Sequence, residues 1–201
     1  MNTYFKTPPL IINLLIINAL VFMAQAFLPI DVSNSMTDLF ALYSGTYFRP
    51  WQLLTYMFMH ASWEHLFFNM FALWMFGRIL EYDLGSRRFL IFYLVCGMGA
   101  GLIQLGVNWI EGANGATIGA SGAVFGILLA FGMLHPNDRI MLIFPPIPMK
   151  AKYFVIGYGA LELIFGVTNT FGSVAHFAHL GGMLWGFLLL YWWKKRRKIY
   201  Y

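Results

Sequence analysis

The chain has 201 residues, of which 60% are hydrophobic and only 10% are charged. A soluble domain carries about a quarter charged residues, so the composition excludes an ordinary soluble protein and places the chain in a lipid bilayer. The length leaves no room for a second domain. We therefore expect one membrane domain over residues 1–201, with a basic tail at 194–201.

Six apolar stretches approach the roughly 20 residues that are needed to span a bilayer. In chain order, the predicted spans are about 10–28, 62–80, 89–110, 118–135, 152–169 and 174–193. The first stretch also resembles a signal peptide, but its removal would leave five spans and reverse one terminus, so we keep it. The predicted fold class is an all-α membrane protein, a bundle of six transmembrane helices.

Residues 29–61 form the longest polar interval and are expected to be a large loop between the first two spans. Within it, the stretch "WQLLTYMFMH" at 51–60 is too apolar for a free loop and too short to span a membrane. We therefore expect it to be partly embedded in the protein or the membrane interface. Ser62 is a suitable N-cap for the second span, with Glu64 in its first turn.

Basic residues are retained on the cytoplasmic side of short loops. With six spans, all 13 basic residues except Arg49 fall on that side. Both termini are therefore predicted to be cytoplasmic, and the 29–61 loop faces the outer side. The basic tail is interpreted as an orientation signal beside lipid, and nucleic acid is not an expected partner.

Polar residues within spans are costly and are candidates for function. Here they gather near the starts of the second, fourth and sixth spans, which all begin at the outer side. They are His60, His65, Asn69, Ser121, His176 and His179. The topology therefore predicts one polar layer a few residues below the outer surface.

A serine hydroxyl is a weak nucleophile until a base takes its proton, and histidine is well suited to that role. His179 is the natural partner of Ser121, because the adjacent glycines, including Gly182, would allow the fourth and sixth helices to approach closely. The Asn69 amide, the His65 ring and the Ser121 backbone N–H are candidate donors to an oxyanion.

Acidic residues are absent from this layer within the spans. Glu162 is expected at about mid-depth in the fifth span, too deep to orient His179. The residues therefore predict a two-residue Ser121/His179 dyad. Cys96 is the only cysteine, which leaves no disulfide framework and no cysteine-based metal motif.

Other interpretations of these residues stay open. Ser121 among glycines is also typical of helix packing, and histidines at helix starts are often interfacial. The imidazoles of His60, His65, His176 and His179 would suit a metal or haem membrane protein. The dyad needs no cofactor and no metal.

Several separated motifs resemble the rhomboid family of intramembrane serine proteases. "HASWEHLFFNM" at 60–70 is similar to the family's second-helix motif, "EYDLG" at 81–85 to the motif that follows it, "GASGAVFG" at 119–126 to the nucleophile motif, and "AHLGG" at 178–182 to the sixth-helix histidine motif. These motifs occur in the family's order and cover nearly the whole chain.

The resemblance implies an intramembrane serine endopeptidase that cleaves transmembrane segments near the outer face. It assigns Ser121 as nucleophile, His179 as base and acid, and His65 and Asn69 as oxyanion stabilisers. Phe125 matches an aromatic position that packs on the catalytic imidazole. The remaining residues carried over as pocket or structural support are Gly119, Gly122, His60, Gly182 and Glu81.

The resemblance also implies that the substrates are membrane proteins with helix-destabilised transmembrane segments. They are expected to enter between the second and fifth helices. The small six-helix core is typical of a bacterial inner membrane protein. A catalytically silent relative that binds membrane helices is the alternative, although Ser121 and His179 are both present.

Overall fold

The computed structural model describes residues 7–141, 146–168, 170 and 175–196, and these are mostly helical. The described helices are α1 (Pro9–Phe27), α2 (Ile30–Phe40), η2 (Gly45–Tyr47), α3 (Gln52–Thr55), η3 (Tyr56–Phe58), α4 (Trp63–Ala72), η4 (Leu73–Gly77), α5 (Arg78–Leu84), α6 (Ser86–Glu111), α7 (Ser121–Leu134), α8 (Ala151–Thr168) and α9 (His176–Lys195). The described strands are β1 (Arg139–Met141) and β2 (Pro148–Lys150).

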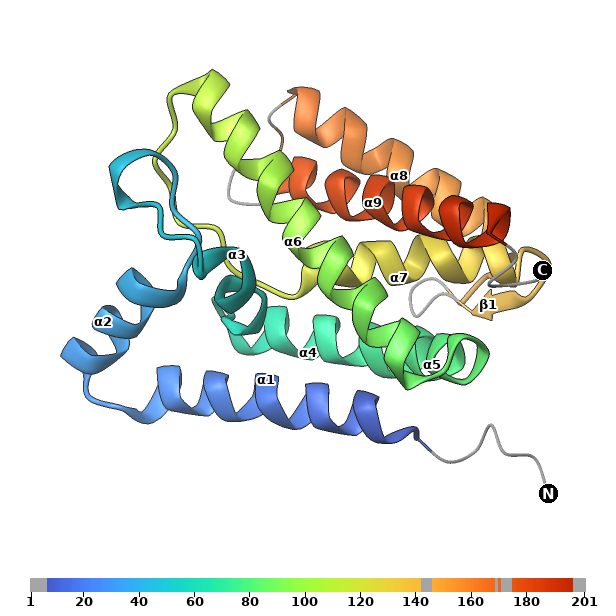
Figure 1. Cartoon of the computed structure of the whole chain (residues 1–201), viewed down its shortest axis with the longest axis horizontal. Coiled ribbons are helices and arrows are strands. Elements are labelled where there is room, and N and C mark those ends of the chain that lie inside the picture. The colour runs from blue at the N-terminus through green and yellow to red at the C-terminus, as the bar shows by residue number, and fades with distance from the viewer. Residues whose placement is uncertain (1–6, 142–145, 169, 171–174, 197–201) are drawn as a thin grey trace.

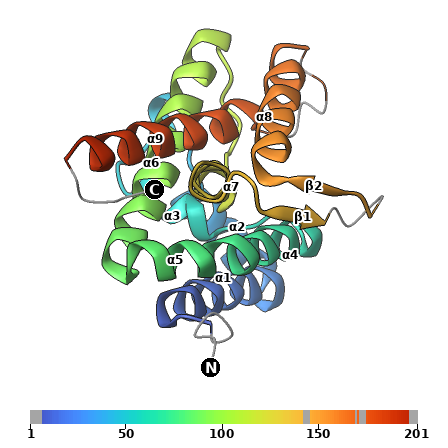
Figure 2. The same cartoon turned by 90° about the vertical axis from the view of Figure 1, so that its right-hand side faces the viewer.

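The long helices lie roughly side by side and alternate in direction (Figure 1). Helices α1, α6 and α8 run one way, whereas α4 with α5, α7 and α9 run the other. The start of α1 and the end of α9 therefore lie at the same end of the bundle. Seen end-on, α7 occupies the centre and the other helices surround it (Figure 2), which agrees with the burial of most of its residues.

Three described helices are long and apolar enough to cross a membrane, namely α1, α6 and α8. The other predicted spans coincide with the continuous run α4–η4–α5, with α7 and with α9. Helix α7 has only 14 residues, so the number of membrane crossings stays a prediction. Residues 169 and 174, at the ends of two predicted spans, and 197–201 of the basic tail lie outside the described residues.

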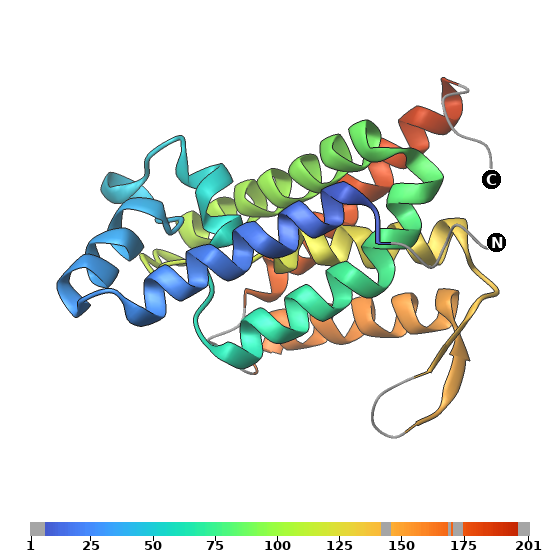
Figure 3. The same ribbon diagram turned by 90° about the horizontal axis from the view of Figure 1, so that it is seen from below.

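The second half of the interval between α1 and α4 packs against the bundle, whereas α2 lies at the edge of the molecule and has no buried residue (Figure 3, blue to cyan). The interval contains α2, which the sequence analysis did not predict, followed by α3 and η3. Tyr56 and Met57 of η3 are almost completely buried. The Tyr56 hydroxyl donates a hydrogen bond of 2.6 Å to the carbonyl oxygen of Gly97 in α6. A side chain at Gly97 would overlap Met57. The absence of a side chain at Gly97 therefore leaves room for η3 to pack against α6.

Two local features differ from the all-α prediction. The connection between α7 and α8 contains a short antiparallel pair, in which Arg139 lies opposite Lys150. Pro136 lies just after α7, and the residue before a proline is disfavoured in the helical conformation. His135 is accordingly non-helical. Within the second predicted span, Leu73–Gly77 form a π-helical turn, which no hydrophobic pattern indicates.

Glycines bring α7 and α9 into backbone contact. A Cβ on Gly182 would overlap the carbonyl oxygen of Gly122, and one on Gly126 would lie 3.0 Å from the carbonyl oxygen of Gly182. Close approach of this kind is the usual role of small residues at four-residue spacing. The first turns of α7 and α9 are therefore held side by side.

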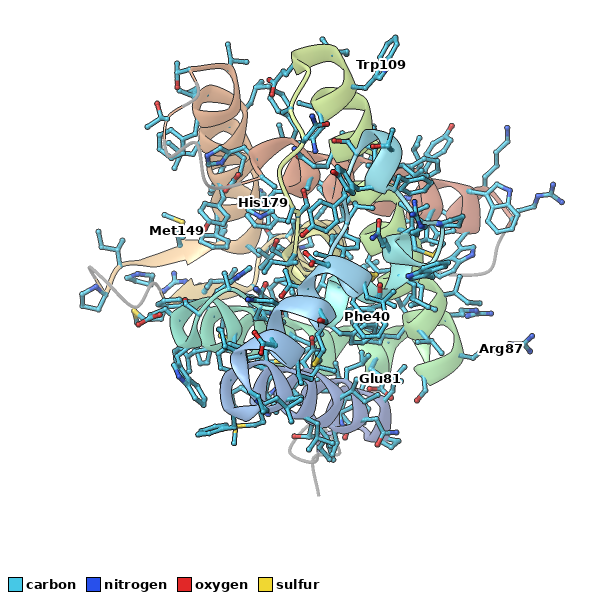
Figure 4. The ribbon with its side chains drawn as sticks, turned by 90° about the vertical axis from the view of Figure 1, so that its left-hand side faces the viewer. Phe40, Glu81, Arg87, Trp109, Met149 and His179 are labelled. Carbon is cyan, nitrogen blue, oxygen red and sulfur yellow. The ribbon has the colours of Figure 1, made fainter. Side chains whose placement is uncertain are left out.

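Glu81 stabilises a different part of the bundle. Its carboxylate accepts hydrogen bonds from the backbone N–H groups of Leu10 and Ile11 and from the hydroxyl of Ser86. These bonds tie the first turn of α1 to α5 and α6. In Figure 4, Glu81 lies beside α1, whereas His179 lies in the middle of the bundle. Its contacts thus make Glu81 a structural support.

Candidate active site

Ser121 and His179 meet at the starts of α7 and α9. Ser121 is the first residue of α7, and His179 lies in the first turn of α9. The Oγ atom of Ser121 is 2.9 Å from Nε2 of His179, which is a hydrogen bond between the two side chains. The contact depends on the glycine packing described above, because Gly122 directly follows Ser121 and Gly182 lies one turn after His179. A hydroxyl that hydrogen-bonds an imidazole nitrogen is the geometry of an activated serine.

The other nitrogen of His179 contacts Glu162, which corrects the sequence analysis. His179 Nδ1 lies 2.9 Å from Oε2 of Glu162, so the prediction that Glu162 is too deep was wrong. Glu162 lies six residues before the end of α8, about 9 Å along the helix, and His179 lies about 4.5 Å into α9. The glutamate side chain is long enough to cover this difference in depth. A depth estimated from the backbone position alone leaves out the length of the side chain.

His176 adds a fourth member to this cluster. Its Nδ1 is 2.7 Å from the same Glu162 oxygen, and its Nε2 is 2.9 Å from the carbonyl oxygen of Thr170. All three residues, Glu162, His176 and His179, are buried. Buried polar groups are normally hydrogen-bonded, and this cluster satisfies that rule through its own members.

The same cluster has donor atoms suited to a metal. One ligand atom from each of Glu162, His176 and His179 lies within 4.8 Å of the others, and two histidines with a carboxylate are common metal ligands. This set differs from the four histidines considered from the sequence. His60 and His65 pair with each other instead, with ring centroids 5.0 Å apart.

His65 in α4 lies beside Gly119, on the approach to Ser121. Gly119 has a positive φ of 125°, and a Cβ there would lie 2.7 Å from Nε2 of His65 and 3.7 Å from the Ser121 hydroxyl oxygen. Nδ1 of His65 accepts a long hydrogen bond of 3.4 Å from the backbone N–H of Ala61. This bond favours the tautomer that carries its proton on Nε2, the nitrogen facing Gly119.

Asn69, one turn after His65, lines the same cavity as Ser121 and His179. Its Nδ2 donates to the carbonyl oxygen of His65 at 3.0 Å, which fixes the amide. The cavity has a volume of about 720 Å³, and its walls come from α4, α6, α7, α8, α9 and the segment before α7. The candidate donors His65 and Asn69 thus line the same cavity as the serine.

Phe125 stacks on the imidazole of His179. The ring centroids are 4.1 Å apart and the planes differ by 6°. Tyr158 of α8 stacks on Phe125 in turn, at 5.2 Å. The contact that the motif implied for Phe125 is present, and Tyr158 extends it in a way that the sequence did not indicate.

His60 lies behind His65 in the segment before α4. Its backbone N–H and C=O bond to the side-chain amide of Gln25 in α1, and neither ring nitrogen has a partner among the described residues. Burial, with a smaller effect from His65, lowers the pKa of His60 to about 4. The ring is therefore neutral at pH 7 and packs against His65.

These observations define a helical membrane protein with a hydrogen-bonded serine, histidine and carboxylate beside a cavity. The family model of the rhomboid domain matches residues 47–196. The chain therefore belongs to the rhomboid family, a family of intramembrane proteases, and is an integral membrane protein.

Curated relatives come from organelles and from bacteria. Rhomboid protein 1, mitochondrial, of Saccharomyces cerevisiae is 35% identical over 68% of this chain and 39% of its own length. Rhomboid-like protein 11, chloroplastic, of Arabidopsis thaliana is 30% identical over 89% of this chain and 63% of its own. YdcA of Bacillus subtilis, whose name assigns it provisionally to the rhomboid proteases, is 32% identical over 69% of this chain and 65% of its own. The chain thus spans less than two thirds of each of these relatives.

Proposed function

We propose that this protein is an intramembrane serine endopeptidase that cleaves transmembrane segments near the outer face of its membrane. The observation that supports this proposal most directly is the 2.9 Å hydrogen bond between Ser121 and His179 beside a cavity of about 720 Å³. Membership of the rhomboid family supports it further. In this proposal Ser121 is the nucleophile and His179 is the general base and acid.

The reaction begins when Oγ of Ser121 bonds to the scissile carbonyl carbon and its proton moves to Nε2 of His179. The carbonyl π electrons move onto the oxygen, which becomes an oxyanion. His179 then returns the proton to the leaving nitrogen as the C–N bond breaks, which leaves an acyl ester on Ser121. Water, deprotonated by His179, hydrolyses that ester and restores the serine.

The oxyanion is stabilised by donors at the start of α7 and from α4. The first N–H groups of a helix have no acceptor within their own helix, and the Ser121 N–H is one of these. His65 Nε2–H, in the tautomer favoured above, and the Asn69 amide complete the site. Donors that are fixed before the reaction stabilise the developing charge without reorganisation.

We further propose a single domain of six spans over residues 1–201, with both termini in the cytoplasm and the partly embedded 29–61 loop outside. The alternating helix directions and the basic residues support this arrangement. The proposed location is the inner membrane of a bacterium. Membrane-impermeant labelling of single cysteines placed at each end tests the topology, and an external C-terminus would overturn it.

The proposed substrates are single-span proteins that unwind locally near their outer end. Carbonyls within a lipid-buried helix are hydrogen-bonded, so a scissile bond must leave the helix before it is attacked. Glycine is about 1 kcal/mol and proline about 3 kcal/mol less favourable than alanine in a helix interior. Substrates with Gly or Pro after the cleaved bond should therefore be cut faster than matched substrates with Leu, and equal rates would exclude unwinding as a limiting step.

A fluorophosphonate probe tests the nucleophile directly. We expect detergent-solubilised protein to acquire one adduct on Ser121, and Ser121→Ala and His179→Ala to acquire none. Both variants should also fail to cleave a model transmembrane substrate, with unchanged thermal unfolding. An unlabelled wild type, under conditions that label a control protease, would favour a catalytically silent relative that binds membrane helices.

The donor set of Glu162, His176 and His179 supports metal binding as a second candidate function. These residues have the right atoms for a divalent cation. A metal bound to Nδ1 of His179 would break the contact of that nitrogen with the Glu162 carboxylate. Metal analysis of purified protein, with cleavage assayed before and after chelation, separates the two functions. Protease activity that survives chelation supports the serine mechanism.

A further inference from the structure

Glu162 and His176 extend the Ser121/His179 pair into a continuous chain of hydrogen bonds. The chain runs from Ser121 Oγ through both nitrogens of His179 to Oε2 of Glu162, and from that oxygen through both nitrogens of His176 to the carbonyl oxygen of Thr170. Its four contacts measure between 2.7 and 2.9 Å. Each of these described residues contacts the next one directly.

The proton positions in this chain follow from the atoms that face one another. His179 must leave Nε2 free to accept the serine proton, so its own proton lies on Nδ1 and is donated to Glu162. Both nitrogens of His176 face oxygen atoms, one of the carboxyl group and one of a backbone carbonyl. His176 therefore holds the same Glu162 oxygen that His179 contacts.

The contacts with His176 and His179 explain how a carboxylate persists more than nine-tenths buried in a membrane protein. An isolated buried charge is expensive, whereas a pair whose remaining hydrogen bonds are satisfied is tolerated. When His179 takes the serine proton, it becomes a cation 2.9 Å from the Glu162 oxygen. The carboxylate stabilises that cation, which forms only during the reaction.

We propose that Glu162 is a positioning residue that holds the tautomer of His179 and stabilises its protonated form, and that His176 holds the Glu162 carboxylate in place. This inference rests on the proposed protease function, because it assigns a role within that reaction. It replaces a two-residue dyad with a relay of four side chains. Glu162 and His176 touch no reacting atom.

Substitutions at Glu162 test the proposal through kcat and KM separately. Loss of the acidic member of soluble triads lowers kcat by about 10⁴-fold. We expect Glu162→Gln to lower kcat by at least about 10²-fold with little change in KM, and Glu162→Asp to retain an intermediate kcat because it keeps the charge. Fluorophosphonate labelling of Ser121 should slow by a similar factor, since it needs no transmembrane substrate.

His176→Asn should have a smaller effect, on the order of tenfold in kcat, because one hydrogen bond to a charged group is lost. The matched control is Asp83→Asn. Asp83 pairs with His135 at 2.7 Å beyond the other end of α7, so the control removes a similar carboxylate and imidazole contact away from the cavity. Its kcat should equal that of the wild type.

Imidazole nitrogen NMR of histidine-labelled protein adds a readout that a merely structural glutamate would not change. In the wild type, the His179 signal, assigned by its loss in His179→Ala, should show a protonated Nδ1. In Glu162→Gln it should shift towards the other tautomer. Thermal unfolding is measured for each variant, and if Glu162→Gln does not fold, Glu162→Asp and His176→Asn decide the question.

Two failures are distinguishable. A wild type that neither cleaves nor reacts with the probe overturns the proposed function, and this inference with it. An active wild type whose folded Glu162 and His176 variants keep full kcat and an unchanged His179 tautomer overturns the relay alone and leaves the Ser121/His179 dyad.

Discussion

The two ends of α7 carry similar chemistry in different surroundings. At its start, His179 and His176 contact the carboxylate of Glu162. Beyond its end, His135 contacts Asp83 at 2.7 Å and Asp138 at 3.3 Å. Both clusters join imidazole to carboxylate at short distance, yet only the first borders a nucleophile and a cavity.

Burial accounts for the difference between the two clusters. The side chains of His135 and Asp83 are about a quarter exposed, so water competes for their hydrogen bonds and screens their charges. The side chains of Glu162 and His179 are at most 10% exposed. A contact between histidine and carboxylate therefore indicates chemistry only when packing also excludes water and supplies a serine.

The largest effect should come from destroying the packing that isolates the buried cluster. Gly182→Ala places a methyl group on the carbonyl of Gly122, which must separate α7 from α9 and break the bond between Ser121 and His179. We expect no detectable cleavage and a loss of stability of about 3 kcal/mol or more, since overpacking costs about 1–3 kcal/mol even where side chains can adjust.

Gly106→Ala is the matched control for this change. A Cβ on Gly106 meets no atom within 4 Å, and alanine is preferred over glycine within a helix by about 1 kcal/mol. The variant should be active and slightly more stable in thermal unfolding. Equal losses in the two variants would contradict the role given to the contact between α7 and α9.

Asn69→Ala tests whether the site at the start of α7 stabilises the charge that develops in the transition state. Removal of one oxyanion donor typically lowers kcat by about 10² to 10³-fold, and His65 should keep the loss at the lower end of that range. KM should change little. An increase in KM with kcat unchanged would assign Asn69 to substrate binding.

Phe125→Leu removes the ring that lies between His179 and Tyr158 but keeps an apolar side chain of similar size. Aromatic stacking contributes about 0.5–1.5 kcal/mol, so kcat should fall by up to about tenfold as His179 becomes less well held. Phe125→Tyr keeps the stack and should retain activity. A similar loss in both variants would show that volume, not stacking, matters at this position.

The smallest effect should come from the partly exposed cluster of His135 and Asp83 beyond the end of α7. Asp83→Asn breaks a partly exposed pair, and such pairs contribute about 0–1 kcal/mol. We expect a change in unfolding free energy within that range and an unchanged cleavage rate. A loss of activity comparable with that of Glu162→Gln would remove the distinction between the two ends of α7.

Local patterns predicted what depends on local chemistry. Ser62 caps α4 through a bond to the His65 N–H, as its position before an apolar run indicated. The glycine spacing predicted the close approach of α7 and α9. Ser121, His65, Asn69 and His179 all line one cavity, because helices that start at the same side bring their first turns together.

The features that were missed depend on side-chain reach and on packing between distant segments. Glu162 was placed by its backbone depth, and neither its length nor the position of α8 against α9 is visible in a hydropathy profile. Tyr56 reaches Gly97, 41 residues further along the chain, and no periodicity connects them. A glutamate in a predicted span was the one signal that pointed to the relay.

Helix α8 is mostly exposed, although it forms one wall of the cavity. Among its described residues only Ala151, Val155 and Glu162 are buried, and near the cavity Tyr158 and Glu162 provide its contacts with Phe125 and His179. In the proposed mechanism, a substrate that enters between α4 and α8 would push on this helix. A sideways displacement of α8 would withdraw the Glu162 carboxylate from His179, so the relay predicts that the serine reacts fastest after the helix has returned to its place.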